Sequence, residues 1–446
     1  MNKKVGVLTL GCKVNQYESE AMIKLLSDAD FQIVDFKEKA DIYIVNTCSV
    51  TNIADKKSRQ MLHRAKKNNP ESVVIACGCY VQAAGEELLK DGAVDIILGN
   101  NLKTEIVSVI NDYFENNGFD RERLEDIASE RCFENMHITE TTETTRAYIK
   151  VQDGCNQFCS YCIIPYVRGR IRSRSIEDCL AEITELAKNG IKEVVLTGIH
   201  LSSYGMEKGF GLSDTAKDYL ETTQKDSDKK LPLLDLIEAV ADIEGILRIR
   251  LGSLEPRIIT DEFLKRIAGI KKLCPHFHLS LQSACNDTLK RMNRHYTIEE
   301  YMDKCELIRK YFDRPAITTD VIVGFPGETD EEFEITKKNL EKLNLYQMHI
   351  FKYSRRGGTV ADRMPDQVDE KVKAARSDVL IEMTTCHEEE YEKSFEGEVL
   401  SVLVEEKITK DGKEYYVGHT PNYIRAELPK TGLDDTCINT IVEHIF

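Results

Sequence analysis

Three cysteines, Cys155, Cys159 and Cys162, stand on one short segment with C-x3-C-x2-C spacing, directly after an apolar run. Three thiolates on such a loop can bind three irons of a cubic 4Fe–4S cluster and leave the fourth iron without a protein ligand. An open metal position is where a substrate or cofactor binds. A zinc loop would need a fourth ligand close by, and the segment has none. The other alternative is that the cysteines pack in the core, but three cysteines so close together rarely all do so. The spacing therefore predicts a cluster with one open iron.

A second set of cysteines, Cys12, Cys48 and Cys79, is spread through the first hundred residues. Each of the three follows an apolar run by a few residues. If these runs are parallel strands, their ends meet at one edge of the sheet, where ligands bind in doubly wound folds. The pattern therefore predicts that three thiols come together. Cys77 competes for the third position, and three scattered core cysteines remain the alternative.

The elements that position the second set lie in residues 1–105, which we predict to be a doubly wound parallel sheet. Its apolar runs alternate with helix-length polar segments, as in βαβ units. The four runs are Val5–Leu10, Asp41–Asn46, Ser72–Ala76 and Asp95–Leu98. Residues 106–143 are acidic and polar, and they are predicted to form a linker.

The first set belongs to residues 144–380, where the alternation restarts and predicts a partial (β/α)6 barrel. The predicted strands are Ala147–Gln152, Glu193–Thr197, Arg248–Ser253, His276–Leu281, Ile317–Val323 and Met348–Tyr353. Residues 205–231 lack periodicity and are predicted to be an inserted surface loop. A charged helix over 368–393 leads to short strands with turn signals, so residues 381–446 should end in a small antiparallel β-barrel.

Composition limits the classes of protein that fit. The 446 residues are 41% apolar and 30% charged, with no apolar run long enough to span a membrane and no signal-peptide pattern, so we expect a cytoplasmic protein with no membrane contact. In a reducing compartment the 14 cysteines favour metal binding over disulfides. The net charge of −16 argues mildly against non-specific nucleic-acid binding.

The Cys155–Cys162 segment resembles the radical S-adenosylmethionine (SAM) superfamily in its spacing and in its place after the first barrel strand. The resemblance implies that SAM binds the open iron, that an external donor supplies one electron, and that the resulting 5′-deoxyadenosyl radical abstracts a hydrogen atom. The cofactor carries the chemistry and the protein positions it. Residues at the carboxyl ends of later strands are the implied SAM contacts, although Gly324 could equally serve a tight turn: Thr197, Gly198, Ser253, Glu255, Gln282 and Gly324.

The segments around the second cysteine set resemble the methylthiotransferase family, and the resemblance covers essentially the whole chain. The matching segments are Leu10-Gly11-Cys12-Lys13-Val14-Asn15-Gln16-Tyr17, Asn46-Thr47-Cys48-Ser49 and Gly78-Cys79-Tyr80. The resemblance implies that Cys12, Cys48 and Cys79 bind a second 4Fe–4S cluster, with Cys79 preferred over Cys77. It also implies a C-terminal TRAM-type RNA-binding barrel. One SAM molecule would methylate sulfur at the second cluster and another would supply the radical, so all six cysteines are catalytic. The sulfur source stays open.

Clusters of basic residues beside the predicted site favour a polyanionic substrate on an otherwise acidic chain, although ordinary solvated charge is the alternative. The first cluster is Arg146, Lys150, Arg168, Arg170, Arg172 and Arg174. The second is Lys56, Lys57, Arg59, Arg64, Lys66 and Lys67, and Lys352, Arg355 and Arg356 add to it. The C-terminal segment does not fit a polyanionic substrate, because residues 395–446 carry ten acidic and five basic side chains. Its Tyr415, Tyr416, Tyr423 and Arg425 could stack on bases or could pack in the fold.

The Cys12 segment and the stretch 163–174 resemble most closely the subgroup that acts on threonylcarbamoyladenosine at position 37, in the tRNA anticodon loop. Its product is the 2-methylthio derivative of that base. Methylthiolation of isopentenyladenosine in tRNA and of a ribosomal protein aspartate remain alternatives within the family. A non-catalytic iron–sulfur RNA-binding protein is the alternative from another class, but it would leave the barrel and the open iron without a role.

Overall fold

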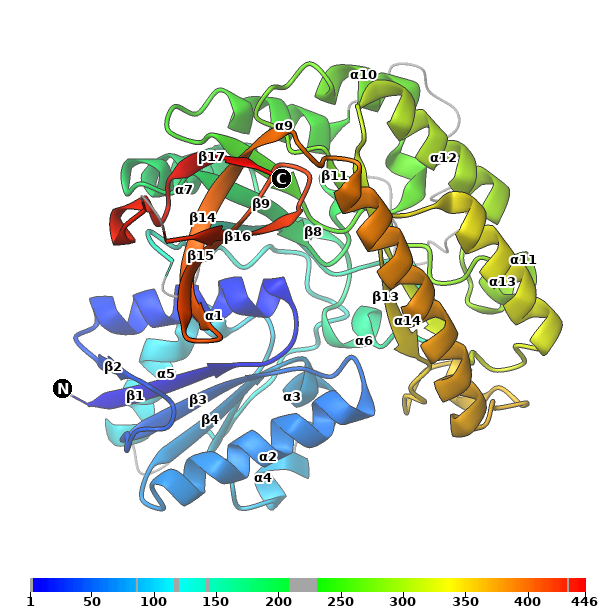
Figure 1. Cartoon of the computed structure of the whole chain (residues 1–446). Helices are drawn as coiled ribbons and strands as arrows, with labels where there is room; N and C mark the ends of the chain where they lie inside the picture. The colour runs from blue at the N-terminus through cyan, green and yellow to red at the C-terminus, as the bar shows by residue number, and fades with distance from the viewer. Residues whose placement is uncertain (1–2, 86, 116–119, 142–144, 208–230, 431–432) are drawn as a thin grey trace.

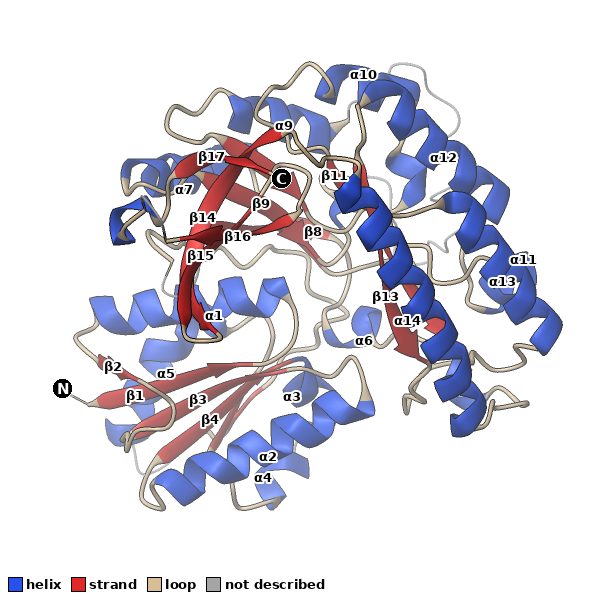
Figure 2. Ribbon diagram, in the orientation of Figure 1, coloured by secondary structure: helices blue, strands red, loops and turns tan. Residues whose placement is uncertain are grey.

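The computed structural model describes residues 3–85, 87–115, 120–141, 145–207, 231–430 and 433–446. An N-terminal α/β unit, a larger central α/β unit and a small antiparallel sheet follow one another along the chain (Figure 1). Helices cover the parallel sheets of the first two units (Figure 2). The α/β class with parallel sheets and the C-terminal antiparallel sheet are thus confirmed. Most of the predicted inserted loop, residues 208–230, lies outside the described residues.

The N-terminal sheet is parallel throughout, in the order β2-β1-β3-β4-β5-β6. Its strands are β1 (Lys4–Thr9), β2 (Gln32–Val34), β3 (Ile42–Thr47), β4 (Val73–Gly78), β5 (Ile96–Leu98) and β6 (Glu122–Arg123). Strands β1 and β3 are neighbours although β2 separates them in sequence, so the winding direction reverses between them. The crevice at such a reversal is the ligand site of doubly wound folds.

Helices cover both faces of this sheet, as the two apolar clusters on either side of it show. Helices α1 (Lys13–Asp28) and α5 (Ile106–Glu115) cover one face. Helices α2 (Asn52–Asn68), α3 (Cys79–Ala84) and α4 (Glu87–Lys90) cover the other (Figure 1). The segment 106–143, predicted as a linker, contributes α5 and β6 to this unit.

The central unit places six parallel strands side by side in sequence order. A sheet β10-β9-β7-β8 and a sheet β11-β12-β13 adjoin through single parallel bridges between residues 249 and 273 and between residues 254 and 279. The six predicted strands are confirmed, each to within three residues, and β8 is an additional short antiparallel strand. The bounds are β7 (Arg146–Asp153), β8 (Arg172–Ser173), β9 (Glu193–Gly198), β10 (Arg248–Leu251), β11 (His276–His278), β12 (Ala316–Val323) and β13 (Gln347–Lys352).

The connecting helices bury the alternate, apolar residues of these strands in the main core. They are α7 (Ile176–Lys188), α9 (Pro232–Ala241), α10 (Asp261–Ile267), α11 (Asn286–Arg291), α12 (Ile298–Tyr311) and α13 (Asp330–Leu343). The short helix α6 (Ile164–Val167) instead contacts α3 of the N-terminal unit. Thr297 and Thr329 start α12 and α13 with capping boxes that satisfy the first backbone N–H groups. Helix α14 (Glu370–Lys393) lies along β13 (Figure 1). It runs without a break through residue 380, where we expected the segment with the partial barrel to end.

The other face of the six strands is polar, since successive residues of a strand point to opposite faces. On β7, for example, Ala147 and Ile149 belong to the apolar core, whereas Tyr148 and Lys150 point the other way. We call this second face the polar face. The strand registers place further residues on the polar face, namely Arg146, Glu193, Thr197, Arg248, Arg250, His276, His278, Thr318, Asp320 and His349.

The C-terminal sheet is antiparallel, in the order β16-β15-β14-β17. Its strands are β14 (Val399–Lys410), β15 (Lys413–His419), β16 (Arg425–Pro429) and β17 (Ile441–Ile445). It docks on the amino ends of the central strands, where Arg248 donates to the His419 carbonyl (2.8 Å) and the Ser401 carbonyl (2.9 Å). Tyr423 lies between the rings of His276 and His419, with centroids 4.5 and 4.7 Å away. The Tyr423 and Tyr416 rings therefore pack within the fold, Tyr416 being buried in the core of this sheet.

Candidate active site

The structure brings Cys155, Cys159 and Cys162 together in the loop that follows β7. Cys155 is buried and the other two are half-buried. Burial, followed by the nearby Cys159 sulfur, raises the pKa of Cys155 to about 12. Burial also raises the pKa of Cys162, and the sulfurs of Cys159 and Cys155 add to the effect. Thiols whose pKa is raised in this way, as at Cys155 and Cys162, become thiolates when a metal ion binds them.

The backbone before this loop permits no ordinary side chain at position 154. Gly154 has φ +71°, and a Cβ there would lie 1.8 Å from the Arg170 carbonyl oxygen. Glycine adopts this conformation without steric cost, and its missing Cβ allows so close an approach. The Cys155 N–H can then donate to the Gly169 carbonyl at 3.0 Å, which ties the start of the loop to the segment after α6.

A half-buried arginine supports the first cysteine set from the other side. Arg294 Nη1 donates to Cys159 Sγ at 3.3 Å, and its guanidinium lies over the Tyr296 ring at 4.9 Å. A charged N–H donor favours the thiolate form of the sulfur that accepts it. Arg294 follows α11 and carries no motif, so its role could not be read from the sequence.

The second set, Cys12, Cys48 and Cys79, also comes together, at the carboxyl ends of β1, β3 and β4. Burial raises the pKa of Cys48 to about 11, and the sulfurs of Cys79 and Cys12 contribute to that rise. Gly11 has φ +103°, and a Cβ there would lie 2.8 Å from Cys48 Sγ. Glycine at this position therefore allows the Cys12 segment to approach Cys48 closely.

Cys77 does not join this group. It lies on β4 in the core beneath α1 and α5, and its sulfur contacts the Val45 carbonyl at 3.8 Å. Cys48, by contrast, belongs to the cluster on the opposite face of the sheet. Cys79 stands two residues later, at the start of α3, where the chain has left the sheet. Of the two competing thiols, Cys79 is the one beside Cys12 and Cys48.

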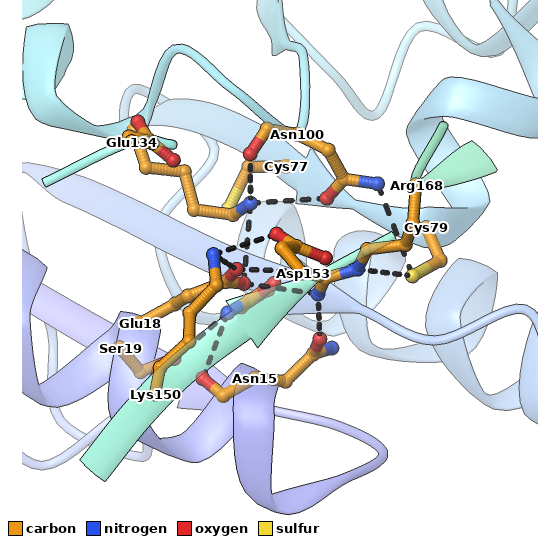
Figure 3. A network of polar contacts seen from close by, with 12 residues as sticks. Asn15, Glu18, Ser19, Cys77, Cys79, Asn100, Glu134, Lys150, Asp153 and Arg168 are labelled. Carbon is orange, nitrogen blue, oxygen red and sulfur yellow. Dashed lines mark hydrogen bonds and ion pairs between the residues drawn. The ribbon is translucent and has the colours of Figure 1, made fainter. Parts of the chain in front are cut away.

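Arg168 connects the second cysteine set to the central unit (Figure 3). Its Nε donates to Cys79 Sγ at 3.3 Å, and its Nη2 donates to Asn15 Oδ1 at 2.6 Å. Its Nη1 lies 2.5 Å from Glu18 of α1 and 3.2 Å from Asp153 of β7. Asp153 stands two residues before Cys155. The fully buried guanidinium of Arg168 therefore contacts both a neighbour of the first cysteine set and the Cys79 sulfur of the second set.

The charges around Arg168 form a buried network between the two units. Lys150 Nζ lies 2.7 Å from both Glu18 and Asp153, and Lys103 Nζ lies 3.2 Å from Glu18 (Figure 3). Burial alone would raise the pKa of Glu18, but Arg168, Lys103 and Lys150 outweigh it and hold that pKa well below its usual range. Buried ions need such partners, because an uncompensated charge costs several kcal/mol. The network therefore holds the two units together.

The first set of basic residues is not a nucleic-acid surface, and that interpretation is wrong. Arg146, Lys150, Arg168, Arg172 and Arg174 are all buried. Their cationic groups pair with carboxylates of the fold, as Arg174 does with Glu182. Arg170 is half-buried over the Phe158 ring, at 4.6 Å. A one-dimensional count cannot distinguish a buried cation that has a distant partner in sequence from a solvated one.

The basic face of α2 is exposed, as the sequence predicts. Lys56, Lys57, Arg59, Arg64 and Lys67 all reach solvent, and Lys66 pairs with Asp95 at 2.6 Å. The helix begins next to Cys48, and the exposed Ile53, with 78% of its surface accessible, lies in its first turn. Lys352 and Arg355 are exposed, and Asn52 Nδ2 donates to the Arg355 carbonyl at 2.7 Å. Arg356 is instead buried against Asp55.

The predicted SAM contacts all lie at or just after the carboxyl ends of central strands. Thr197 and Gly198 end β9, and a Cβ on Gly198 would lie 2.8 Å from Gln152 Oε1. The N–H of Phe325, next to Gly324, donates to Glu328 at 3.0 Å. The remaining residues are Ser253, which is exposed, Glu255, which accepts from Arg257 Nε at 2.7 Å, and Gln282, with φ +74°. Gln152, which accepts from the His200 N–H at 2.7 Å, is a further polar group here that the sequence did not indicate.

Two family models match the chain. Residues 149–340 match the radical SAM superfamily, and residues 4–99 match a family described as uncharacterized protein family UPF0004. The two matches cover the two cysteine sets separately. Among the described residues, no helix combines the length and the apolar character needed to cross a membrane.

Curated relatives match over nearly the full length. The chain is 40% identical over 426 residues, 94% of the chain and 89% of the relative, to the threonylcarbamoyladenosine tRNA methylthiotransferase MtaB of Bacillus subtilis. It is 37% identical to the protein of the same name from Aquifex aeolicus, over 91% of the chain and 93% of the relative. A tRNA-2-methylthio-N(6)-dimethylallyladenosine synthase of Finegoldia magna is 33% identical, over 94% of the chain and 87% of the relative.

Solved structures with the same fold are much more distant in sequence. The radical SAM methyltransferase TsrM of Kitasatospora setae, with cobalamin and a [4Fe–4S] cluster bound, matches with a TM-score of 0.55 at 14% identity, over 79% of the chain and 72% of TsrM. The cobalamin-dependent SAM radical enzyme OxsB matches with a TM-score of 0.51 at 11% identity, over 96% of the chain and 64% of OxsB. At these identities the likeness concerns the fold alone.

Proposed function

Because the chain belongs to the family of radical-SAM tRNA methylthiotransferases, we propose that it adds a methylthio group to C2 of N6-threonylcarbamoyladenosine at position 37 of tRNA. The product is the 2-methylthio derivative of that base. The observation that carries this proposal is the 40% identity, over 89% of its length, to a relative named for this substrate. SAM and iron–sulfur clusters are the cofactors of the reaction.

The two cysteine sets have the donors that two 4Fe–4S clusters need. Cys155, Cys159 and Cys162 bind one cluster, and Cys12, Cys48 and Cys79 bind the other. Each set offers three converging sulfurs and leaves one iron open. Each also has one arginine that donates to a sulfur, namely the half-buried Arg294 to Cys159 and the buried Arg168 to Cys79. When bound, the clusters and SAM supply a hydrogen-abstracting radical and a methylated sulfur.

The protein's own part is to hold the groups in position. The six central strands form a partial (β/α)6 barrel whose polar face lines the site, and their carboxyl ends bind SAM through Thr197, Gly198, Ser253, Glu255, Gln282 and Gly324. The Arg168 network sets the separation of the two cysteine sets. An external electron donor and a sulfur source act on the enzyme from outside.

The chain divides by role. Residues 1–105 form the methylthiotransferase domain with the second cluster, and α5 and β6 of the segment 106–143 belong to it before the chain passes to the rest. Residues 144–380 form the radical-SAM domain, and 381–446, which begin within α14, form the end of that helix and a TRAM-like RNA-binding barrel. The anticodon loop approaches along the exposed basic face of α2, since that face starts beside Cys48 and its cations can contact phosphates.

The test is reconstitution followed by product analysis. Anaerobically reconstituted protein should carry about eight irons. With SAM and a one-electron reductant, it should convert threonylcarbamoyladenosine in tRNA to a product that nucleoside mass spectrometry finds one methylthio group heavier. If the protein converts tRNA that carries dimethylallyladenosine and does not convert tRNA that carries threonylcarbamoyladenosine, the proposed substrate is wrong. A Cys155→Ala variant that still releases 5′-deoxyadenosine would overturn the assignment of the first cluster.

A further inference from the structure

Lys13, the residue after Cys12, reaches from the second cysteine set toward the polar face of the central strands. It starts α1, and its ammonium nitrogen lies 5.3 Å from the centroid of the Tyr148 ring on β7. Its side chain is exposed to solvent, as is Cys12 beside it. On the same strand, Arg146 stands two residues before Tyr148 and pairs with Glu193 of β9 at 3.7 Å. Lys13 is thus a cation of the N-terminal unit placed at the amino half of the central strands.

This cation has no counter-ion of its own. Among the described residues Lys13 forms no salt bridge, and Glu193, a carboxylate of the polar face, is already shared by three arginines. Arg250 Nε holds Glu193 at 2.9 Å, and Arg146 also pairs with Glu405 of the C-terminal sheet at 2.6 Å. This part of the polar face therefore has more cations than anions, and an additional carboxylate would be attracted to it.

Hydrogen-bonding groups lie on the strands opposite Lys13. His349 of β13 is exposed and lies in register with Asp320 on the polar face. Its ring lies 5.8 Å from that of His278, whose Nε2 is 3.3 Å from Asp320 Oδ2. An ammonium group, imidazoles and a carboxylate together suit a ligand that carries a carboxylate and a hydroxyl. They do not suit a hydrocarbon, since a hydrocarbon would desolvate them without replacing their hydrogen bonds.

The substrates named for the matching relatives differ in this property. Threonylcarbamoyladenosine carries a free carboxylate and a hydroxyl on the group attached to N6, and dimethylallyladenosine carries a branched hydrocarbon there. We propose that Lys13 binds the threonyl carboxylate of the substrate base and is a specificity-determining residue of this enzyme. The proposal deepens the function proposed above and depends on it. Because Lys13 adjoins Cys12, binding at this point also brings the base to the second cysteine set.

A site built to pair a charge discriminates against a ligand that lacks it, because only the charged ligand replaces the water around Lys13 with an ionic hydrogen bond. A charge-assisted hydrogen bond contributes about 1.5–3 kcal/mol, which corresponds to roughly a 10- to 100-fold change in affinity. The wild-type protein should therefore bind an anticodon stem-loop RNA that carries threonylcarbamoyladenosine at least about 10-fold more tightly than the same RNA carrying the threonyl methyl ester.

The experiment measures dissociation constants of the reconstituted protein for the acid, its methyl ester and the dimethylallyl form of one stem-loop RNA. Lys13→Met should lower the affinity for the acid about 10-fold and leave that for the ester unchanged, and Lys13→Arg should restore most of the loss. Lys24→Met, which removes the same charge farther along α1, should bind all three RNAs as the wild type does. Equal iron content in all variants shows that the cluster sites have formed.

Two outcomes would overturn the proposal: wild-type protein that binds acid and ester equally, or Lys13→Met protein that still prefers the acid as strongly as the wild type. The comparison of acid and ester in wild-type protein does not depend on the folding of any variant. Failure of the proposed function is a separate result, namely wild-type protein that binds the acid RNA but never methylthiolates it under conditions where SAM is cleaved.

Discussion

Replacing Glu18 by Gln should destabilise the protein severely, although the two side chains have nearly the same shape. Glu18 is completely buried, and its carboxylate lies within 3.2 Å of Lys103, Lys150 and Arg168. The substitution leaves Lys150 and Arg168 with Asp153 as their shared anion, and it removes the one salt bridge that Lys103 forms among the described residues. Removing one partner of a buried ion pair costs about 3–5 kcal/mol, because the charges that remain stay desolvated. We expect the free energy of unfolding to fall by that amount.

Urea unfolding under anaerobic conditions measures the loss. The matched control is Asp28→Asn, which removes a carboxylate of the same helix whose partner, Lys24, lies on the surface. Exposed pairs of this kind contribute about 0–1 kcal/mol. If Glu18→Gln costs no more than Asp28→Asn, the network does not hold the two units together and the reasoning is wrong.

The pH dependence gives an independent check with a definite sign. Folding lowers the pKa of Glu18, since Arg168, Lys103 and Lys150 outweigh the effect of burial. A carboxyl whose pKa is lowered by folding stabilises the protein above its unfolded pKa of about 4.3 and loses that contribution as the pH falls toward the folded value. The difference between wild type and Glu18→Gln should therefore be complete at pH 7 and shrink by about 1.4 kcal/mol per pH unit below about 4.3. A difference that stays constant down to pH 3.5 would contradict this account.

Three further predictions concern the cysteines, the docked sheet and the basic helix. Cys79→Ser should reduce the iron content from about eight to about four per chain, whereas Cys77→Ser should leave it unchanged; equal losses by colorimetric iron analysis would contradict the placement of Cys79. Tyr423→Ala should lower the free energy of unfolding by about 3 kcal/mol and speed proteolysis between the C-terminal sheet and the central strands, because the ring is stacked on both sides; an unchanged cleavage pattern would argue against docking through this ring. Lys56→Gln with Lys57→Gln should weaken tRNA binding and reduce the slope of log affinity against log salt by about 0.7–0.9 per charge, and an unchanged slope would mean that these lysines do not contact phosphates.

The cysteine sets could be predicted from sequence because strand alternation and loop position are local properties. Cys12, Cys48 and Cys79 each follow a strand, and the parallel sheet then brings them to one edge. The strands themselves were found to within three residues for the same reason. The choice between Cys77 and Cys79 could be made only from the resemblance to the methylthiotransferase family. The two thiols are two residues apart in sequence, and they lie in different places only because β4 ends between them.

The electrostatics could not be predicted, because the partners are far apart in the chain. Arg168 pairs with Glu18, 150 positions earlier, and the sequence contains no sign of that pair. Counted locally, Arg168 and Arg174 add to a basic patch, but in the fold they neutralise buried carboxylates. The predicted basic surface is present on α2, whose cations lie on one exposed face of a regular helix, and at Lys352 and Arg355.

The Arg168 network also constrains the order in which the protein can be completed during synthesis. The N-terminal unit leaves the ribosome first and carries Glu18 together with Lys103, but two of the cations that surround Glu18, at positions 150 and 168, are translated later. Translation adds about 5–20 residues per second. For several seconds the three thiols around Cys12 therefore lack the guanidinium that later covers Cys79, and they are open to the machinery that delivers iron and sulfide.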